Sequence, residues 1–176
     1  MHDRGTAFGL GVLGGAAGLA AMELVGAITR PVMPPSPRGG RAFATDEERS
    51  MSPLGLRHRP DESATDALGR IVYEKILRRP PSRRVQQALS WAIHIGYGLA
   101  LAGVVAAIGR PSRRALGTGA LLGAALWLFG DELAVPLLGL ADRPTAYPPA
   151  RHAQSLLQHL GYGVATVAAT RALARR

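Results

Sequence analysis

The chain has 176 residues, of which 47% are hydrophobic, and carries 21 Lys and Arg against 12 Asp and Glu, a net charge of +9. This length suits one domain, and the lack of cysteine excludes disulfides, thiolate metal sites and cysteine nucleophiles. The basic excess does not indicate nucleic-acid binding, because long stretches carry almost no charge and the arginines gather at their ends. That distribution is typical of a protein that meets lipid headgroups.

The first predicted element is an apolar helix over 7–29, in which Glu23 is the one formal charge. Small residues recur at four-residue spacing as Gly11/Gly15 and Gly14/Gly18, a spacing that lets helix backbones approach closely in lipid. The run is long enough to cross a bilayer, which takes ~20 residues, and long for the apolar part of a signal peptide. We therefore expect a retained transmembrane helix.

A polar loop over 36–84 follows the first helix. Residues 36–62 are rich in Pro, Gly, Ser and Arg and predict irregular structure. Over 63–79, apolar residues recur at helical spacing behind a capping residue, Ser63 or Thr65, while Arg70, Glu74 and Arg78 fall elsewhere. This pattern predicts a short amphipathic helix, which lies either on the membrane surface or against the end of a helical bundle.

Three further transmembrane helices are predicted over 85–109, 115–140 and 150–172. The third helix of the chain repeats the small-residue spacing at Gly119/Gly123, and its Pro136 leaves the carbonyl of Glu132 without the usual backbone donor. The rival interpretation is a soluble, alanine-rich bundle. Such a bundle would carry charged residues on the outward face of every helix, and these runs do not.

Two segments of the chain resemble each other. His94-Ile-Gly-Tyr97-Gly98 returns 65 residues later as His159-Leu-Gly-Tyr162-Gly163, and Arg-Pro/Pro-Pro turns occur near 30–35 and 143–149. We interpret the chain as one all-α, polytopic membrane domain over 1–176. It would consist of two parallel helix-hairpin repeats, 7–109 with the inserted loop 36–84 and 115–175, related by an axis along the membrane normal.

Ionisable residues inside transmembrane runs are rare and indicate functional sites. Because neighbouring helices run antiparallel, late positions in one helix and early positions in the next lie at similar depth. The repeat symmetry directs two histidines and two glutamates towards the central axis, and an aspartate faces inwards or reaches the headgroups. The resulting intramembrane polar layer contains Glu23, His94, Tyr97, Asp131, Glu132, His152, His159 and Tyr162.

Three roles for this layer stay open at this point. His94 and His159 could hydrogen-bond Glu23 and Glu132 and hold the helices together. The same groups could move protons or ions, although four helices leave little room for alternating access unless the chain forms a homodimer or joins a membrane complex. Finally, His94 and His159 could ligate haem b, as in an accessory subunit of a membrane redox complex.

The sequence carries no motif that favours an enzyme. The Glu-x-x-His pattern of two-metal carboxylate bundles is absent, and so are phosphate-binding glycine loops, nucleophile elbows and zinc motifs. We therefore expect a non-enzymatic protein whose partner is the lipid bilayer rather than nucleic acid, and we assign no metal ligands.

One string of residues resembles a known family. Asp131-Glu132-Leu-Ala-Val-Pro136, then Tyr147-Pro148 and His152, then His159-Leu-Gly-Tyr-Gly163, are similar to the YagU-like family of bacterial inner-membrane proteins, whose function is unknown. The similarity covers most of the chain except the loop 36–84. It implies a multi-pass protein of the bacterial inner membrane and no established reaction. Arginines between the second and third helices and at the C-terminus favour cytoplasmic termini, whereas the total number of basic residues, which is larger in the long loop, favours the opposite orientation.

Overall fold

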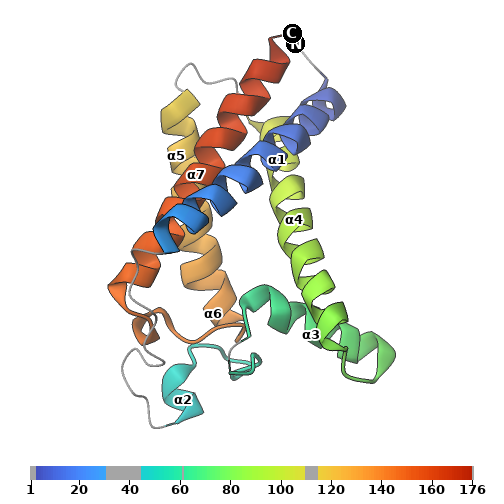
Figure 1. Ribbon diagram of the computed structural model, residues 1–176, viewed down its shortest axis with the longest axis vertical. Helices are drawn as coiled ribbons and strands as arrows, with labels where there is room; N and C mark the ends of the chain where they lie inside the picture. Colours follow the sequence, from blue (N-terminus) through green and yellow to red (C-terminus); the bar gives the residue numbers. More distant parts are fainter. Residues whose placement is uncertain (1–2, 31–44, 61, 110–114, 176) are drawn as a thin grey trace. The chain divides into compact units, whose positions relative to one another are not determined.

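A computed structural model describes residues 3–30, 45–60, 62–109 and 115–175. Over these ranges the chain is helical and contains no strand, which confirms the all-α prediction (Figure 1). A π-helical stretch, Trp127–Ala134, joins α5 to α6, and a 3₁₀ turn, Pro144–Ala146, precedes α7. The helices are α1 (Arg4–Thr29), α2 (Asp46–Arg49), α3 (Ala64–Leu77), α4 (Arg83–Ile108), α5 (Ala115–Leu126), α6 (Val135–Leu137) and α7 (Pro149–Ala174).

These elements divide between two compact units. The first, here the bundle unit, contains described residues 3–30, 96–109, 115–128 and 149–175. The second, here the polar unit, contains described residues 45–60, 62–95 and 129–148. One boundary between the units falls within α4, and another falls within the π-helical stretch Trp127–Ala134. The helices Arg83–Ile108 and Leu116–Leu137 therefore contribute residues to both units.

Within the described residues, three helices are long and apolar enough to cross a membrane: Arg4–Thr29, Arg83–Ile108 and Leu116–Leu137. The predicted count of four such helices is therefore corrected to three. The fourth expected helix does form, as α7, but its composition is less apolar. It carries Arg151, Gln154, Gln158 and Arg171 besides its two histidines.

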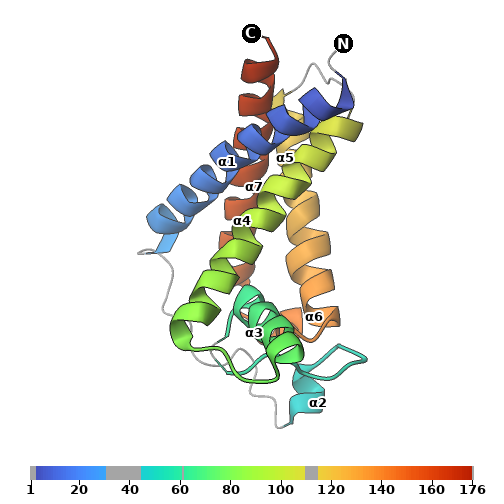
Figure 2. The ribbon, with the colours of Figure 1, turned by 90° about the vertical axis from the view of Figure 1, so that its right-hand side faces the viewer.

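Helix α1 packs antiparallel against α7 in the bundle unit (Figures 1 and 2). A Cβ added at Gly14 would lie 2.7 Å from the Thr166 carbonyl oxygen, and one at Gly18 would lie 2.8 Å from the Tyr162 carbonyl oxygen. The other glycine pair of α1 faces α4, where a Cβ at Gly15 would lie 2.7 Å from the Ala102 Cβ. The predicted close approach of helices at these glycines is confirmed.

Helix α7 also packs against α5, so it has neighbours on two sides. A Cβ at Gly119 would lie 2.6 Å from the Gly163 carbonyl oxygen, and one at Gly123 would collide with the His159 carbonyl oxygen. This double contact accounts for the composition of α7. Among its polar side chains, Gln154, Gln158 and Tyr162 contact other helices of the bundle unit, so these positions do not need apolar residues.

The second copy of the repeated segment contacts Gly98, the last residue of the first copy, in the bundle unit, and the tyrosines of the two copies differ in burial. The Tyr162 hydroxyl on α7 donates a hydrogen bond to the Gly98 carbonyl on α4, with an oxygen–oxygen distance of 2.6 Å. Tyr162 is 3% exposed, whereas its counterpart Tyr97 is 58% exposed. The antiparallel pairs α1/α4 and α5/α7 suit two hairpins, and the internal duplication stays a prediction.

Helix α3 confirms the short helix predicted over 63–79. Ser63 caps its first turn: the Ser63 hydroxyl accepts from the Asp66 backbone N–H, and the Asp66 carboxylate accepts from the Ser63 N–H. The helix lies against the first half of α4 in the polar unit. A Cβ at Gly69 would be 3.0 Å from the Leu89 Cβ.

Part of the loop expected to be irregular is ordered by contacts within the polar unit. Helix α2 occupies Asp46–Arg49, and the Gly139 carbonyl accepts from the Arg57 and His58 N–H groups at 2.8 and 3.1 Å. Gly139 itself has φ 71°, a conformation that favours glycine. The first predicted Pro-Pro turn and the arginine loop between α4 and α5 lie outside the described residues.

Candidate functional site

Two of the three acidic residues of the predicted layer lie where the helix Leu116–Leu137 widens into a π-helix. Asp131 and Glu132 belong to the π-helical stretch Trp127–Ala134, with Asp131 exposed and Glu132 half-buried. Pro136 follows and cannot donate to the Glu132 carbonyl, which confirms the predicted irregularity. Its π-helical form was not predicted. Such wider turns are frequent at functional sites.

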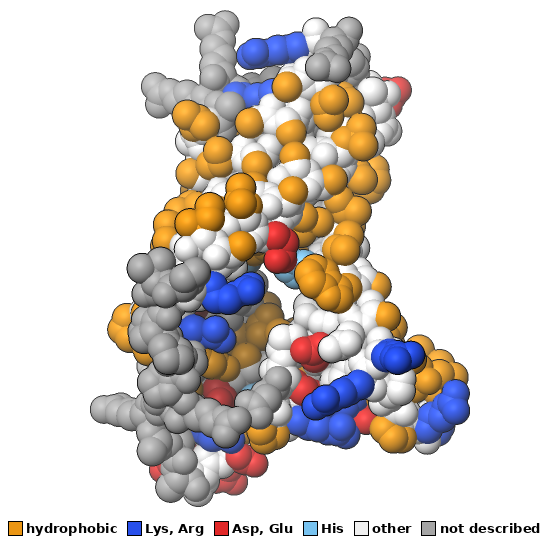
Figure 3. Space-filling model, in the orientation of Figure 1, with side chains coloured by type: hydrophobic (Ala, Val, Ile, Leu, Met, Phe, Trp, Pro, Cys, Tyr) orange, Lys and Arg blue, Asp and Glu red, His pale blue; other side chains and the backbone are white. Residues whose placement is uncertain are grey.

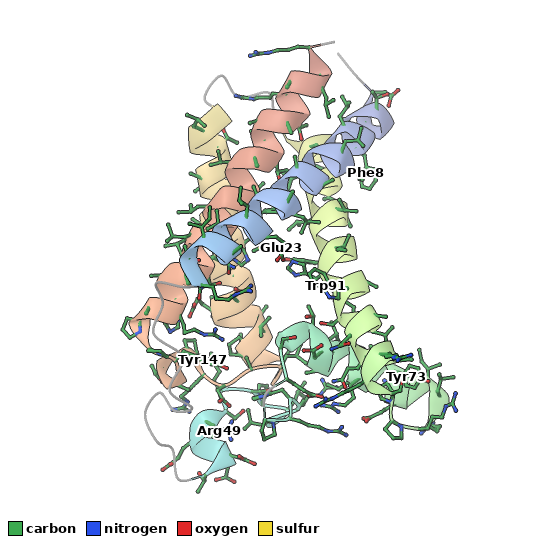
Figure 4. The ribbon with its side chains drawn as sticks, in the orientation of Figure 1. Phe8, Glu23, Arg49, Tyr73, Trp91 and Tyr147 are labelled. Carbon is green, nitrogen blue, oxygen red and sulfur yellow. The ribbon has the colours of Figure 1, made fainter. Side chains whose placement is uncertain are left out.

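His94 lies in the part of α4 that belongs to the polar unit, and it is half-buried. The edge of its ring faces the ring of Trp91, with 6.3 Å between the ring centroids and 87° between the planes. Trp91 is labelled in Figure 4 and is 55% exposed. The sequence reasoning missed this neighbour, although a spacing of three residues on a helix would have indicated it.

His159 is held by its own helix. Its Nδ1 lies 2.9 Å from the Ser155 carbonyl oxygen. A carbonyl can only accept, so Nδ1 carries the hydrogen and the neutral ring has its lone pair on Nε2. His152 lies nearer the start of α7 and is half-buried. Glu23 lies near the end of α1 and is exposed (Figure 4).

Two polar contacts of α7 reach other helices of the bundle unit. Besides the bond from Tyr162 to Gly98, the Gln154 amide donates to the Thr29 hydroxyl at 3.2 Å. A Cβ at Gly26 would collide with the Gln158 side-chain nitrogen. Gln154, Gln158 and Thr29 were absent from the predicted layer, because glutamine and threonine attract less attention in sequence than ionisable residues do.

The structure distributes the predicted layer over both units. The polar unit contains His94, Asp131 and Glu132, and the bundle unit contains the other five. Among the described residues, no group of three or more His, Asp or Glu side chains is arranged to hold a metal ion. A common His/Glu layer and haem ligation by His94 and His159 stay predictions.

A cluster of ion pairs that the sequence reasoning did not single out lies in the polar unit. Arg70 is 6% exposed and donates to Glu62 through Nε at 2.6 Å and Nη2 at 2.8 Å. It also bonds the Arg57 carbonyl at 2.7 Å and Glu74 at 3.2 Å. Gln86 of α4 donates to Glu62 at 2.9 Å. These contacts connect α3, the preceding loop and α4.

The electrostatics of Glu62 indicate a structural rather than a catalytic carboxylate. Burial raises its pKa, but hydrogen bonds from Arg70, the Arg59 backbone and Gln86, together with the charge of Arg70, outweigh burial and lower the pKa to about 2. A carboxylate with so low a pKa is a weak base at neutral pH, so it suits ion pairing and not general-base catalysis.

A second cluster surrounds Asp142 in the turn before α7. Asp142 pairs with Arg49 at 3.0 Å and with Nε2 of His58 at 3.1 Å, and its backbone N–H donates to the Tyr147 hydroxyl at 3.2 Å (Figure 4). The hydrogen bond to Asp142 raises the pKa of Arg49. The Arg143 guanidinium donates to the Ser50 carbonyl at 2.8 Å, so this cluster attaches residues 45–60 to the 139–147 turn.

Comparison of the chain with protein-family models, with curated proteins and with solved structures finds no match. The resemblance to the YagU-like family therefore stays a prediction.

Proposed function

We propose that the chain is a non-enzymatic integral membrane protein in which α7 crosses the bilayer as a fourth, polar helix held by α1, α4 and α5. The observation that carries this proposal is the buried bond from the Tyr162 hydroxyl to the Gly98 carbonyl, 2.6 Å long. On the resemblance stated above, we propose the bacterial inner membrane as its location.

Polar side chains of a transmembrane helix are tolerated in lipid only at particular places. A polar side chain in hydrocarbon must find a partner within the protein. In α7, Tyr162 and Gln154 find partners on α4 and α1. The glycines of α1 and α5 bring the helix backbones close enough for such contacts. We therefore propose that the main role of Tyr162 and Gln154 is to form hydrogen bonds between helices.

Replacing Tyr162 by phenylalanine tests this role. Tyr162→Phe removes one interhelical hydrogen bond and is expected to lower the free energy of unfolding by about 0.6 kcal/mol, the average for such bonds in a membrane, and by no more than about 1.7 kcal/mol. Tyr97→Phe is the matched control, since Tyr97 occupies the same place in the repeated motif but is 58% exposed. Unfolding of both variants in mild detergent would be measured. Equal stability of the two variants would contradict the proposed role.

Proton handling is the second candidate, and the orientation of His159 favours it. With Nδ1 donating to Ser155, the opposite nitrogen is the one that can gain and lose a proton. Protein in liposomes loaded with a pH-sensitive dye should then conduct protons, and His159→Gln should abolish the flux. Absence of proton flux in the unaltered protein would contradict proton handling, and interhelical hydrogen bonding would then be the only proposed role.

A further inference from the structure

Helix α3 buries part of its charged surface and leaves an apolar strip uncovered. Ala67 and the ion-paired Arg70 are 0% and 6% exposed. Leu68, Val72 and Ile76 are 36%, 46% and 71% exposed, and their four-residue spacing places them along one strip of the helix. Leu68, Val72 and Ile76 are therefore not the residues by which α3 packs against α4.

Basic residues follow this strip along the chain. The segment from Lys75 to Arg84 contains no acidic residue. Figure 3 shows blue side chains next to orange ones over α3 and the start of α4. The exposed basic residues at the end of α3 and in the connection to α4 are Lys75, Arg78, Arg79, Arg83 and Arg84.

We propose that the strip Leu68/Val72/Ile76 and these basic residues dock α3 on the anionic headgroup surface of the membrane that α4 crosses. The inference rests on the membrane embedding proposed above. α3 ends at Leu77 and α4, a helix apolar enough to span, begins at Arg83 within the same compact unit. The short connection therefore keeps α3 near the point where α4 enters the lipid.

Charge decides between lipid and a protein occupant. An amphipathic helix binds an interface through its apolar area and through attraction of Lys and Arg to anionic lipid. A second copy of this chain would bring the same positive charges to the same strip, and the two copies would repel each other. Anionic headgroups complement both the apolar and the basic parts of the surface.

The absence of cysteine makes a site-specific test direct. Val72→Cys in the full chain would carry an environment-sensitive fluorophore, with the protein in nanodiscs of phosphatidylcholine alone or mixed with phosphatidylglycerol. Brominated lipid should quench the probe at residue 72 strongly only when phosphatidylglycerol is present. The double variant Lys75→Gln/Arg79→Gln should lower the ratio of docked to undocked probe about fivefold for each charge removed.

Two control positions separate the inference from the membrane proposal. The same fluorophore would be placed on Leu121→Cys in α5, where the side chain is 71% exposed, and on Glu47→Cys in α2, which is also exposed. The probe at residue 121 should be quenched in both lipids, and the probe at residue 47 should be quenched in neither. Weak quenching at residue 72, or equal quenching in both lipids, would overturn the docking of α3 on anionic lipid. Failure of quenching at residue 121 would instead overturn the membrane embedding.

Discussion

Gly123→Val is expected to prevent α5 from packing on α7 and to destabilise the bundle by about 3 kcal/mol or more, the upper part of the range for overpacked sites. A Cβ at this position would collide with the His159 carbonyl oxygen and lie 2.9 Å from the Leu160 Cα. Both obstacles are backbone atoms, so a side-chain rotation cannot relieve them and the helices must separate.

Gly117→Val is the matched control on the same helix, because a Cβ at Gly117 would meet nothing within 4 Å. Both substitutions replace a glycine of α5 by the same side chain. Thermal unfolding of the two variants in one detergent would be compared. Similar losses for both would show that backbone contact at Gly123 does not hold α5 on α7.

Arg70→Gln is expected to have the second large effect, a loss of about 3–5 kcal/mol of stability in the polar unit. The substitution leaves Glu62, 10% exposed, without its cation. Arg59→Gln is the control: Arg59 pairs with Glu74 at 3.1 Å but is 58% exposed, and exposed pairs contribute about 0–1 kcal/mol. Hydrogen exchange of the α3 backbone amides would report both effects.

In the unaltered protein, acid should lower the stability of the polar unit as Arg70→Gln does at neutral pH. The pKa of Glu62 is lowered from its ordinary value of 4.5 to about 2, so its contribution is complete above pH ~4.5 and disappears as the pH falls towards 2. Once the pH dependence of the intrinsic exchange rate is divided out, the protection of the α3 amides should fall over this window. Arg70→Gln should lose most of that dependence. Unchanged acid sensitivity in Arg70→Gln would contradict the pairing.

Features that depend on local spacing could be predicted from the sequence. The glycine pairs of α1 and α5, the Ser63 cap and the amphipathic pattern of α3 involve residues within one helix, where spacing alone determines which side chains share a face. The pattern could not show which face of α3 would be covered. That outcome depends on Arg70 meeting Glu62 and the Arg57 carbonyl.

Contacts between residues far apart in the chain could not be predicted from the sequence. Asp142 meets His58 and Arg49 across 84 and 93 residues, and no local pattern indicates such pairs. Tyr97 and Tyr162 occupy the same place in the repeated segment, yet Tyr97 is 58% exposed and Tyr162 is 3% exposed, because Tyr162 packs against α4 and donates to the Gly98 carbonyl. The position of α7 between α1 and α5, which explains how its polar residues find partners, could not be predicted from local spacing either.

We propose that α7 crosses the membrane together with α1, α4 and the helix Leu116–Leu137. Single cysteines at Arg4, Glu47 and Ala174, all exposed, would be labelled in intact cells with a membrane-impermeant maleimide. Four crossings place residues 4 and 174 on one side and residue 47 on the other. Labelling of residue 174 together with residue 47, and apart from residue 4, would mean three crossings and would contradict the account.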